Sequence, residues 1–541
     1  MSELQTPPPV AVQGNIIDTY RIPSNGDPDS SAEVFIVDDD SLGKYVVRLP
    51  PLEHEQLRAI DLLKENLRNS IPVEAAGTPE QILEKYLWET ASKTGLLSVV
   101  QEAHRKFLYY LLKDFAGFWE VDPLINDDNL EEISVTRYDK PVRVFHRKFT
   151  EYMFIETNVS YQSEERLQAF IRRLAQFGGT TVSLAQPSLE VTLHGASDRR
   201  VSATFGDEIS RPGSTYSIRK QKEKPLTIVQ LTASELARPY PTGVTLPSDM
   251  NAKYEEVAFH KTLSALMAAY FWLLLEKTTN LVICGETSSG KTTLMNAILA
   301  MMNPKAKIVT AEDVLEINLP DHLHWQRLKT RSHRAGLSPL SGRYEYNLSD
   351  LLKLALRFSP TILSLGEMRG EESETVAAAI TLGFSTITTV HAEDAERCIQ
   401  RVTTAPMRFA KGHVRDITAV ATMRKIILPD GRIVRRVVSV DEVRPVGQDA
   451  HETINIFRYS YETDSFSPTT PEEVLERSFR LKQIAASFGW TLVNVLGGLT
   501  SRAGYIASAI TKGEFSVEDL SSLVRRYVAR EYPRELQRAR S

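Results

Sequence analysis

The sequence has few cysteines, since Cys284 and Cys398 are the only two among 541 residues. Two thiols cannot build a disulfide framework or a four-thiolate zinc site, and this low usage fits a reducing compartment. The apolar uncharged stretch Thr262 to Leu275 is shorter than the ~20 residues that span a bilayer. The N-terminus, MSELQTPPPVAVQGN, lacks the basic start and apolar stretch of a secretory signal. We therefore expect a cytoplasmic protein whose association with the cytoplasmic membrane is peripheral.

The sequence also lacks a strong charge bias. Its net charge is -5, with 25% charged and 42% hydrophobic residues, which is the balance of an ordinary globular protein. Such a chain has no overall electrostatic attraction for nucleic acid, so we expect nucleic acid not to be a partner. The length exceeds what one hydrophobic core supports and predicts roughly three or four domains.

Changes in composition and periodicity divide the chain. Residues 1–30 are rich in Pro, Ser, Asp and Gly, which predicts a mobile tail. Amphipathic helical patterns follow, then short alternating runs, then a proline-rich stretch with little periodicity. Beyond Leu281, apolar strands alternate with helical patterns, which predicts an α/β fold with a parallel sheet covered by helices. The predicted parts are a mobile tail (1–30), a helical region (31–117), an α+β domain (118–224), a linker (225–250), an α/β domain (251–447) and a C-terminal helical region (448–541).

One motif indicates the chemistry most directly. It follows the apolar run LVIC and opens a helical pattern, the context in which G-x-x-x-x-G-K-[ST] indicates a phosphate-binding P-loop. The glycines let backbone N–H groups approach phosphates, Lys291 reaches the β and γ oxygens, and Thr292 holds Mg²⁺. We therefore expect ATP and Mg²⁺ as cofactors. The motif consists of Gly285, Glu286, Thr287, Ser288, Ser289, Gly290, Lys291, Thr292 and Thr293.

Three further strand ends supply candidate catalytic side chains. Glu367 ends the run TILSLGE, from which a P-loop fold places an acid near Mg²⁺, here through a water molecule. Glu316 ends TAEDVLE, and a carboxylate there can orient or deprotonate the water that attacks the γ-phosphate. His391 follows STITTV and can sense the γ-phosphate. Taken alone, Glu316 is equally compatible with a solvated strand end, and Glu367 and His391 are more often structural residues at a strand end.

Four segments together resemble the Walker A, Asp-box, Walker B and His-box series of the type II/type IV secretion ATPases. They are GETSSGKTTLMNAI, KIVTAEDVLEINLP, LLKLALRFSPTILSLGEMRGEE and GFSTITTVHAEDAERCIQRV. Upstream, DPLINDDNLEEISV, RVSATFGDEISRPGSTYSIRK and KPLTIVQL are similar to the N-terminal domain of the archaeal branch, whose members build pili and archaella. The resemblance covers residues 105–447.

The resemblance implies a PAS-like N-terminal domain, a RecA-like ATPase domain and a homo-hexameric ring with ATP between the two domains. It assigns Glu316 as the catalytic carboxylate and Glu367 as the Walker B acid. Arg200 and Arg219 match family arginines that reach the nucleotide from the N-terminal domain. There they would stabilise transition-state charge only when the domains close. The implied partners are a polytopic membrane platform protein and, indirectly, pilin-like filament subunits.

Two departures from the family pattern concern the expected rate. Phe384 stands where the His box usually carries a histidine, and since Phe cannot hydrogen-bond, we expect one polar contact near the catalytic carboxylate to be missing. Ser359 stands where many archaeal relatives carry Arg.

Two absences narrow the subtype. The two cysteines cannot build the zinc module of bacterial pilus-extension ATPases, and the signature of bacterial retraction ATPases is also missing. An archaeal assembly or secretion motor is therefore the better match.

Three hypotheses about function remain open at this point. The leading one is an ATPase motor that assembles a type IV pilus-like filament or drives secretion. The second is a DNA-translocating ring ATPase, because the runs Arg327 to Arg334 and Arg432 to Arg436 offer basic charge. The third is a nucleotide-binding scaffold with weak ATPase activity, which Phe384 suggests.

Overall fold

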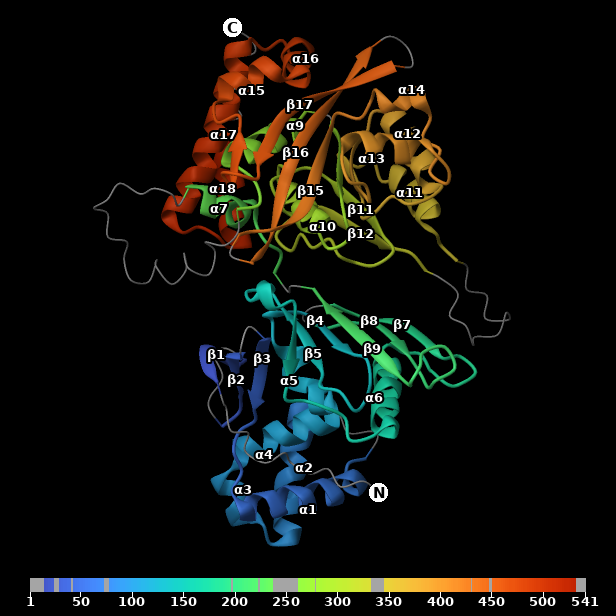
Figure 1. Cartoon of the computed structure of the whole chain (residues 1–541), viewed down its shortest axis with the longest axis vertical. Coiled ribbons are helices and arrows are strands. Elements are labelled where there is room, and N and C mark those ends of the chain that lie inside the picture. Colours follow the sequence, from blue (N-terminus) through green and yellow to red (C-terminus); the bar gives the residue numbers. More distant parts are fainter. Residues whose placement is uncertain are drawn as a thin grey trace, which may run out of the picture. The chain divides into compact units, whose positions relative to one another are not determined.

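The computed structural model describes residues 14–23, 29–39, 42–72, 77–195, 198–221, 224–236, 261–277, 279–331, 345–429, 431–446 and 450–531. The chain divides into two compact units, Met1–Glu223 and Lys224–Ser541. Figure 1 colours the first from blue to green and the second from green to red. Residues 1–13 of the predicted tail and 237–250 of the predicted linker lie outside the described residues.

The first unit contains a nine-stranded mixed sheet in the order β1-β2-β3-β6-β5-β4-β9-β8-β7. Neighbouring strands are antiparallel except β3 and β6, which are parallel. The strands are Asn15–Ile22 (β1), Ala32–Asp39 (β2), Leu42–Arg48 (β3), Leu130–Val135 (β4), Arg143–His146 (β5), Phe154–Thr157 (β6), Ser188–Leu193 (β7), Arg199–Thr204 (β8) and Thr215–Lys220 (β9).

Strands β1 to β3 lie where the sequence predicts a mobile tail and a helical region, so that prediction was wrong for residues 15–22, 32–39 and 42–48. β2 reads AEVFIVDD, which is rich in the β-branched and aromatic residues that suit a pleated sheet. Ile36 of β2 and Tyr45 of β3 are fully buried in the core of the unit. β3 pairs with β6, more than 100 residues along the chain, and local periodicity cannot reveal such a partner.

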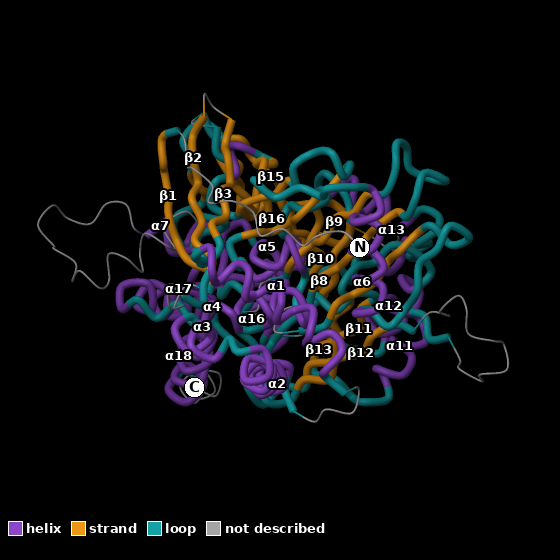
Figure 2. The backbone as a smooth tube through the Cα atoms, turned by 90° about the horizontal axis from the view of Figure 1, so that it is seen from below, coloured by secondary structure: helices purple, strands orange, loops and turns teal. Residues whose placement is uncertain are grey.

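Helices of the first unit form two groups. α1 to α4 share an apolar core that includes Leu63, Leu87 and Phe107, and Figures 1 and 2 show these helices clustered together. α6 instead packs Phe170 and Leu174 against the core of the sheet. The helices are His54–Ser70 (α1), Pro79–Thr94 (α2), Leu97–Glu102 (α3), His104–Leu111 (α4), Leu112–Ala116 (η1), Trp119–Val121 (η2), Asp122–Asn126 (α5), Thr150–Tyr152 (η3) and Glu164–Phe177 (α6).

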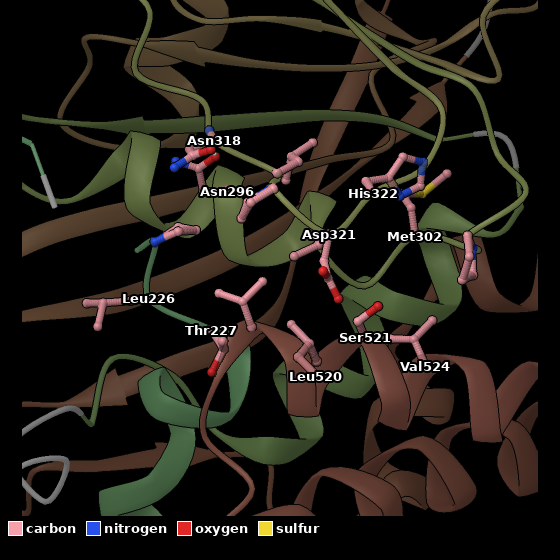
Figure 3. Close-up of a pocket in the computed structure, with 16 residues that line it drawn as sticks. Leu226, Thr227, Asn296, Met302, Asn318, Asp321, His322, Leu520, Ser521 and Val524 are labelled. Carbon is pink, nitrogen blue, oxygen red and sulfur yellow. The ribbon is translucent and has the colours of Figure 1, made fainter. Parts of the chain in front are cut away.

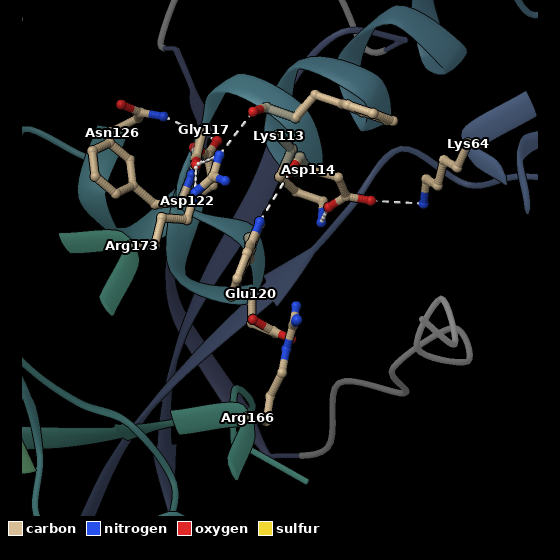
Figure 4. A network of polar contacts seen from close by, with 12 residues as sticks. Lys64, Lys113, Asp114, Gly117, Glu120, Asp122, Asn126, Arg166 and Arg173 are labelled. Carbon is tan, nitrogen blue, oxygen red and sulfur yellow. Dashed lines mark hydrogen bonds and ion pairs between the residues drawn. The ribbon is translucent and has the colours of Figure 1, made fainter. Parts of the chain in front are cut away.

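A polar network joins α1, η1 and α6 (Figure 4). Asp114 of η1 lies 2.7 Å from the ammonium group of Lys64 of α1, and both side chains are almost fully buried. Burial alone would raise the pKa of Asp114, but the ammonium groups of Lys113 and Lys64 outweigh it and lower the pKa. Arg173 of α6 donates to the carbonyl groups of Phe115 and Gly117, both at 2.9 Å. Charged groups that are buried in this way need their partners.

The second unit contains another nine-stranded mixed sheet, in the order β12-β11-β13-β14-β10-β15-β16-β17-β18. The six strands from β12 to β15 are parallel, and the pairs from β15 to β18 are antiparallel. The strands are Asn280–Gly285 (β10), Ile308–Glu312 (β11), Trp325–Lys329 (β12), Ile362–Leu365 (β13), Ser385–Val390 (β14), Ala419–Ile427 (β15), Ile433–Val446 (β16), Ala450–Ser460 (β17) and Ser465–Ser467 (β18).

Helices cover both faces of the parallel strands, as expected for the α/β fold that the sequence predicts. Along β10, Leu281 and Ile283 join a core with α9, α10 and α17, whereas Val282 and Cys284 join a core with α11, α12 and α13. The helices are Ile228–Leu236 (α7), Ala265–Leu275 (α9), Lys291–Leu299 (α10), Leu348–Leu356 (α11), Glu372–Thr381 (α12), Ala395–Thr403 (α13), Lys411–Val414 (α14), Pro471–Arg477 (α15), Phe479–Phe488 (α16), Leu492–Lys512 (α17) and Val517–Arg530 (α18).

The C-terminal region differs from the predicted helical segment. Its first residues form β17 and β18, which extend the sheet of the second unit. The prediction of a helical region beginning at residue 448 was therefore wrong for these two strands. Val495 and Leu499 of α17 belong to the same core as α9. α7, inside the predicted linker, packs into this core as well. These segments are therefore integral parts of the second unit, because they bury one face of its sheet.

No single helix within the described ranges is long and apolar enough to cross a bilayer. α16 and α17 reach the required apolar length only as a pair, and the chain bends by 114° between them.

Replacing Lys64 by Met tests the buried pair with Asp114. We expect the free energy of unfolding of the first unit to fall by about 3 kcal/mol, because a buried carboxylate loses a cation. Lys85→Met is the matched control, since the pair Lys85–Glu89 of α2 spans 4.0 Å at the surface and should change stability by less than about 0.5 kcal/mol. Scanning calorimetry of the whole chain measures both, and equal effects would contradict the expected role of burial.

Candidate active site

The P-loop is a tight turn between β10, which ends at Gly285, and α10, which begins at Lys291. A Cβ atom at Gly285 would lie 2.4 Å from the carbonyl oxygen of Met423 on β15, so this position has no room for a side chain. Gly290 caps α10 in the left-handed region, with φ 95°. The Lys291 ammonium group donates to the carbonyl oxygens of Gly285 at 3.0 Å and Glu286 at 2.8 Å. The loop is therefore stabilised by the hydrogen bonds of Lys291 and by close packing of Gly285 against β15.

The parallel strands bring Glu312 and the predicted residues Glu367 and His391 to the same edge of the sheet. Glu312 ends β11, Glu367 lies two residues beyond β13 and His391 follows β14 directly. Because these strands run parallel to β10, their carboxyl ends meet at the edge that carries the P-loop.

His391 connects the P-loop to the acid after β13. Its Nδ1 atom lies 3.3 Å from the Nζ atom of Lys291, and its Nε2 atom lies 2.9 Å from a carboxylate oxygen of Glu367. Desolvation and the nearby Lys291 charge lower the pKa of His391. A neutral ring with its proton on Nε2 can accept from Lys291 and donate to Glu367 at the same time. Arg369 holds the other oxygen of Glu367 at 2.8 Å.

Glu316 contacts the first turn of α10. The Thr292 hydroxyl donates to the Glu316 carboxylate at 2.9 Å. The side-chain amide of Asn296 donates to the carbonyl oxygen of Glu316 at 3.1 Å and accepts from the backbone N–H of Asn318 at 2.9 Å. Asn296 and Asn318 lie next to each other in Figure 3, at the wall of a pocket that α18 also lines. Glu316 is therefore anchored to the helix that begins at the P-loop.

The structure brings the P-loop residues Gly285 to Thr293 together with Glu316, Glu367 and His391 in the second unit. Arg200 and Arg219 belong to the first unit, where they lie directly opposite each other on β8 and β9. Both side chains are exposed. The two arginines therefore share one face of that sheet, which fits a joint role but leaves their role at the P-loop a prediction.

Two residues at this edge were not predicted. Arg435 of β16 donates from Nε to the carbonyl oxygen of Ser288 at 3.0 Å, so a strand far along the chain braces the P-loop. Glu312 accepts from the backbone N–H groups of Glu316 and Ile317, both at 2.7 Å, and desolvation raises its pKa to about 7. A carboxylate at the end of the buried run IVTAE was the available signal for Glu312. Arg435 has no local signal, because only the pairing of β15 with β16 brings it to the loop.

Comparison with known proteins identifies the family. Residues 248–443 match the model of the family described as type II/IV secretion system protein. The uncharacterized protein MJ1287 of Methanocaldococcus jannaschii is 35% identical over 247 residues, which are 45% of this chain and 87% of that protein. The uncharacterized protein MJ0900 of the same organism is 30% identical. The match covers 68% of this chain but only 60% of the length of that protein. The chain belongs to the type II/IV secretion system protein family.

Among solved structures, the VirB11 ATPase of the Brucella suis type IV secretion system is similar, with 21% identity. The match covers 60% of this chain and 96% of that chain with a TM-score of 0.27. A TM-score this low supports no statement about function. The second unit of this secretion-family chain is a P-loop ATPase domain, as its family and its P-loop establish together.

Phe384 does not lie at the site of this secretion-family ATPase, contrary to the expectation from the sequence. It directly precedes β14, whereas His391 directly follows it. Six strand residues separate the two side chains by roughly 20 Å. Phe384 packs against the apolar core with α11 and α12, and Ser359 likewise precedes β13. The expected loss of a polar contact near the catalytic carboxylate was therefore wrong, because these residues occupy the opposite edge of the sheet.

The donor set at this edge suits a magnesium ion that a nucleotide helps to hold. Within the described part of the chain, no cluster of three or more His, Cys, Asp or Glu side chains could hold a metal alone. Mg²⁺ uses one or two protein oxygens, water and substrate phosphates rather than a protein cage. The Thr292 hydroxyl and the Glu367 carboxylate fit that requirement.

Replacing Gly285 by Ala tests the packing of the P-loop in this ATPase. We expect nucleotide affinity to fall at least about tenfold, equivalent to about 1.4 kcal/mol, because the new Cβ atom would displace the loop from β15. Gly383→Ala is the control, since Gly383 also has a positive φ, 86°, but nothing lies within 4 Å of its Cβ position. That variant should lose about 1 kcal/mol of stability and bind ATP normally by calorimetry. Normal ATP binding by Gly285→Ala would contradict the packing argument.

Proposed function

We propose that this chain is a Mg²⁺-dependent ATPase motor that works as a homo-hexameric ring and powers assembly of a type IV pilus-like filament or secretion across the cytoplasmic membrane. The observation that carries the proposal is the contact of His391 with both Lys291 and Glu367. It links the phosphate-binding loop to the acid after β13, so a change at the phosphates reaches both groups. The single strand β14 between β10 and β13 supports a RecA-like core, and the mixed sheet with α6 supports a PAS-like domain in the first unit.

Each side chain at the P-loop has a role that follows from its position. Lys291 would bind phosphate oxygens, and Thr292 and Glu367 would hold Mg²⁺, the latter through water. A bound Mg²⁺ would neutralise charge that develops on the phosphates. Glu316, anchored beside Thr292, orients the attacking water and accepts its proton. His391 in its neutral form keeps the proton on Nε2 and reports the state of the phosphates to Glu367.

The electrostatics of Arg200 and Arg219 support their role as groups that the first unit contributes. Like charges directly opposite each other on neighbouring antiparallel strands repel, and these two guanidinium groups are such a pair. Glu132 of β4 pairs with Arg219 on the other side and offsets part of the repulsion. An anion that binds both arginines would relieve the remainder. Closure of the first unit on a nucleotide would provide that anion and couple hydrolysis to movement.

The proposed partners and place of action extend the family resemblance. A hexameric ring needs a fixed support in order to do mechanical work, and a polytopic membrane platform protein would provide it at the cytoplasmic membrane. The motor would then act on pilin-like subunits indirectly, through the platform.

The structure weakens both alternatives. Arg436, from one of the two basic runs, is buried and its Nε atom lies 3.1 Å from Asp464, while Arg435 braces the P-loop. Arg327 of the other run lies 3.5 Å from Glu312, and residues 332–334 are outside the described ranges. These arginines have partners within the chain, so they give a DNA translocase little support. A scaffold with a weakened site was suggested by Phe384, which lies at the opposite edge of the sheet.

Mg²⁺-dependent phosphate release tests the active site. We expect Lys291→Ala, Glu367→Gln and Glu316→Gln each to lower kcat by at least about 100-fold, because each removes a charge that acts on the phosphates or the water. DNA should leave wild-type turnover unchanged. Turnover close to wild type in Lys291→Ala and Glu367→Gln would sink the assignment, and strong stimulation by DNA would favour the translocase.

Arg200→Ala and Arg219→Ala test the contribution of the first unit. We expect each to lower kcat roughly 1,000-fold, the lower end for arginines that complete a phosphoryl-transfer site, with ATP affinity changed only a few-fold. Arg143→Ala is the matched control, because Arg143 is an exposed arginine on β5 of the same sheet and pairs with Glu156 at 2.7 Å. Wild-type kcat in both variants, or an equal loss in the control, would remove the arginines from the mechanism.

A further inference from the structure

We infer that Glu312 is the positioning residue that sets the location of Glu316, the group proposed to act on the attacking water. This inference rests on the proposed function, because it matters only if Glu316 takes part in hydrolysis. Glu312 ends β11 and is 1% exposed. Among the described residues, its polar partners are Glu316, Ile317 and Arg327, none of which belongs to the P-loop. Its influence on the reaction would therefore pass through the backbone of Glu316.

The contacts of Glu312 determine the backbone around Glu316. Residues 313–319 form neither helix nor strand, so no regular hydrogen-bond ladder holds them. One oxygen of Glu312 accepts from the backbone N–H groups of Glu316 and Ile317, both at 2.7 Å. On the other side, Asn296 donates to the carbonyl oxygen of Glu316. The peptide groups flanking Glu316 are thus held by two side chains, one from β11 and one from α10.

The sheet also leaves room for Glu312. Gly366, directly before Glu367, packs against it, and a Cβ atom at Gly366 would lie only 3.1 Å from Cγ of Glu312. β11 and β13 are neighbours, with Ala311 opposite Leu365. Glu316 and Glu367 are therefore both placed from the ends of one strand pair. A shift of about 1 Å in a catalytic group can cost roughly 100-fold in rate, so this common reference has a direct kinetic consequence.

Burying the Glu312 carboxyl group costs free energy, and the stability of the loop alone does not explain why a carboxyl group is buried here. Desolvation of a carboxylate is unfavourable, and Arg327 offsets it only from 3.5 Å. Asp313, the next residue, is exposed. The buried oxygen is thus placed where it serves the backbone of Glu316.

Three single variants of the full chain separate positioning from simple structure. Glu312→Met fills the volume without an acceptor and should lower kcat about 100-fold, with KM for MgATP within about threefold. Glu312→Gln keeps an oxygen that can accept both N–H groups and should retain kcat within a few-fold. Asp313→Asn, the matched control in the same segment, should behave as wild type. Wild-type kcat in Glu312→Met would overturn the inference.

A double variant shows whether Glu312 acts through Glu316. Residues that act as one unit are non-additive, so Glu312→Met should cause no further loss of kcat in the Glu316→Gln background. A full second loss there would show that Glu312 acts elsewhere. If Glu312→Met does not fold, Glu312→Asp, whose shorter side chain withdraws the oxygen, should show reduced kcat with normal ATP affinity, and normal kcat would again overturn the inference.

Failure of the proposed function gives a different result. It would appear as no MgATP turnover by the wild type, or as wild-type turnover by Glu316→Gln. If Glu316→Gln is inactive but Glu312→Met turns over MgATP like the wild type, only the positioning role of Glu312 is contradicted.

Discussion

The parallel register of β10, β11, β13 and β14 is the constraint on which the proposed site depends. Parallel strands present all their carboxyl ends at one edge, and each of these strands is followed there by a polar or charged side chain. The P-loop, Glu312, Glu367 and His391 follow or end four separate strands, and the parallel arrangement alone brings them to the same edge. A strand reversed in this set would remove its residue from the edge altogether.

A series of polar and charged side chains, each in contact with the next, stabilises this edge of the sheet. Lys291 faces His391, His391 faces Glu367, and Arg369 holds the far oxygen of Glu367. The neutral imidazole can accept from the ammonium group and donate to the carboxylate, so it links the two charged groups. Glu312 is stabilised in a similar way, because its buried oxygen accepts hydrogen bonds from two backbone N–H groups. The site is thus held largely by partners from neighbouring strands.

Prediction from the sequence succeeded where a motif lies on a regular element and failed where partners are distant. The alternating pattern beyond Leu281 led to the α/β sheet, since each strand and helix carries its own apolar period. β1 to β3 were missed because their stability comes from pairing with β6 and burial of residues such as Tyr45. Phe384 was misplaced because its expected role came from the family's His box, whereas its position directly before β14 puts it at the edge away from His391.

The sequence by itself determined the phosphate-binding loop, since its glycines, Lys291 and Thr292 are contiguous and their chemistry depends on local geometry. It also identified Glu316, Glu367 and His391 as candidates. Only the tertiary structure decided that His391 joins Lys291 to Glu367, that Arg435 braces Ser288, and that Glu312 holds the backbone of Glu316. The physical reason is that these contacts form between strands, whose register depends on burial across the whole sheet.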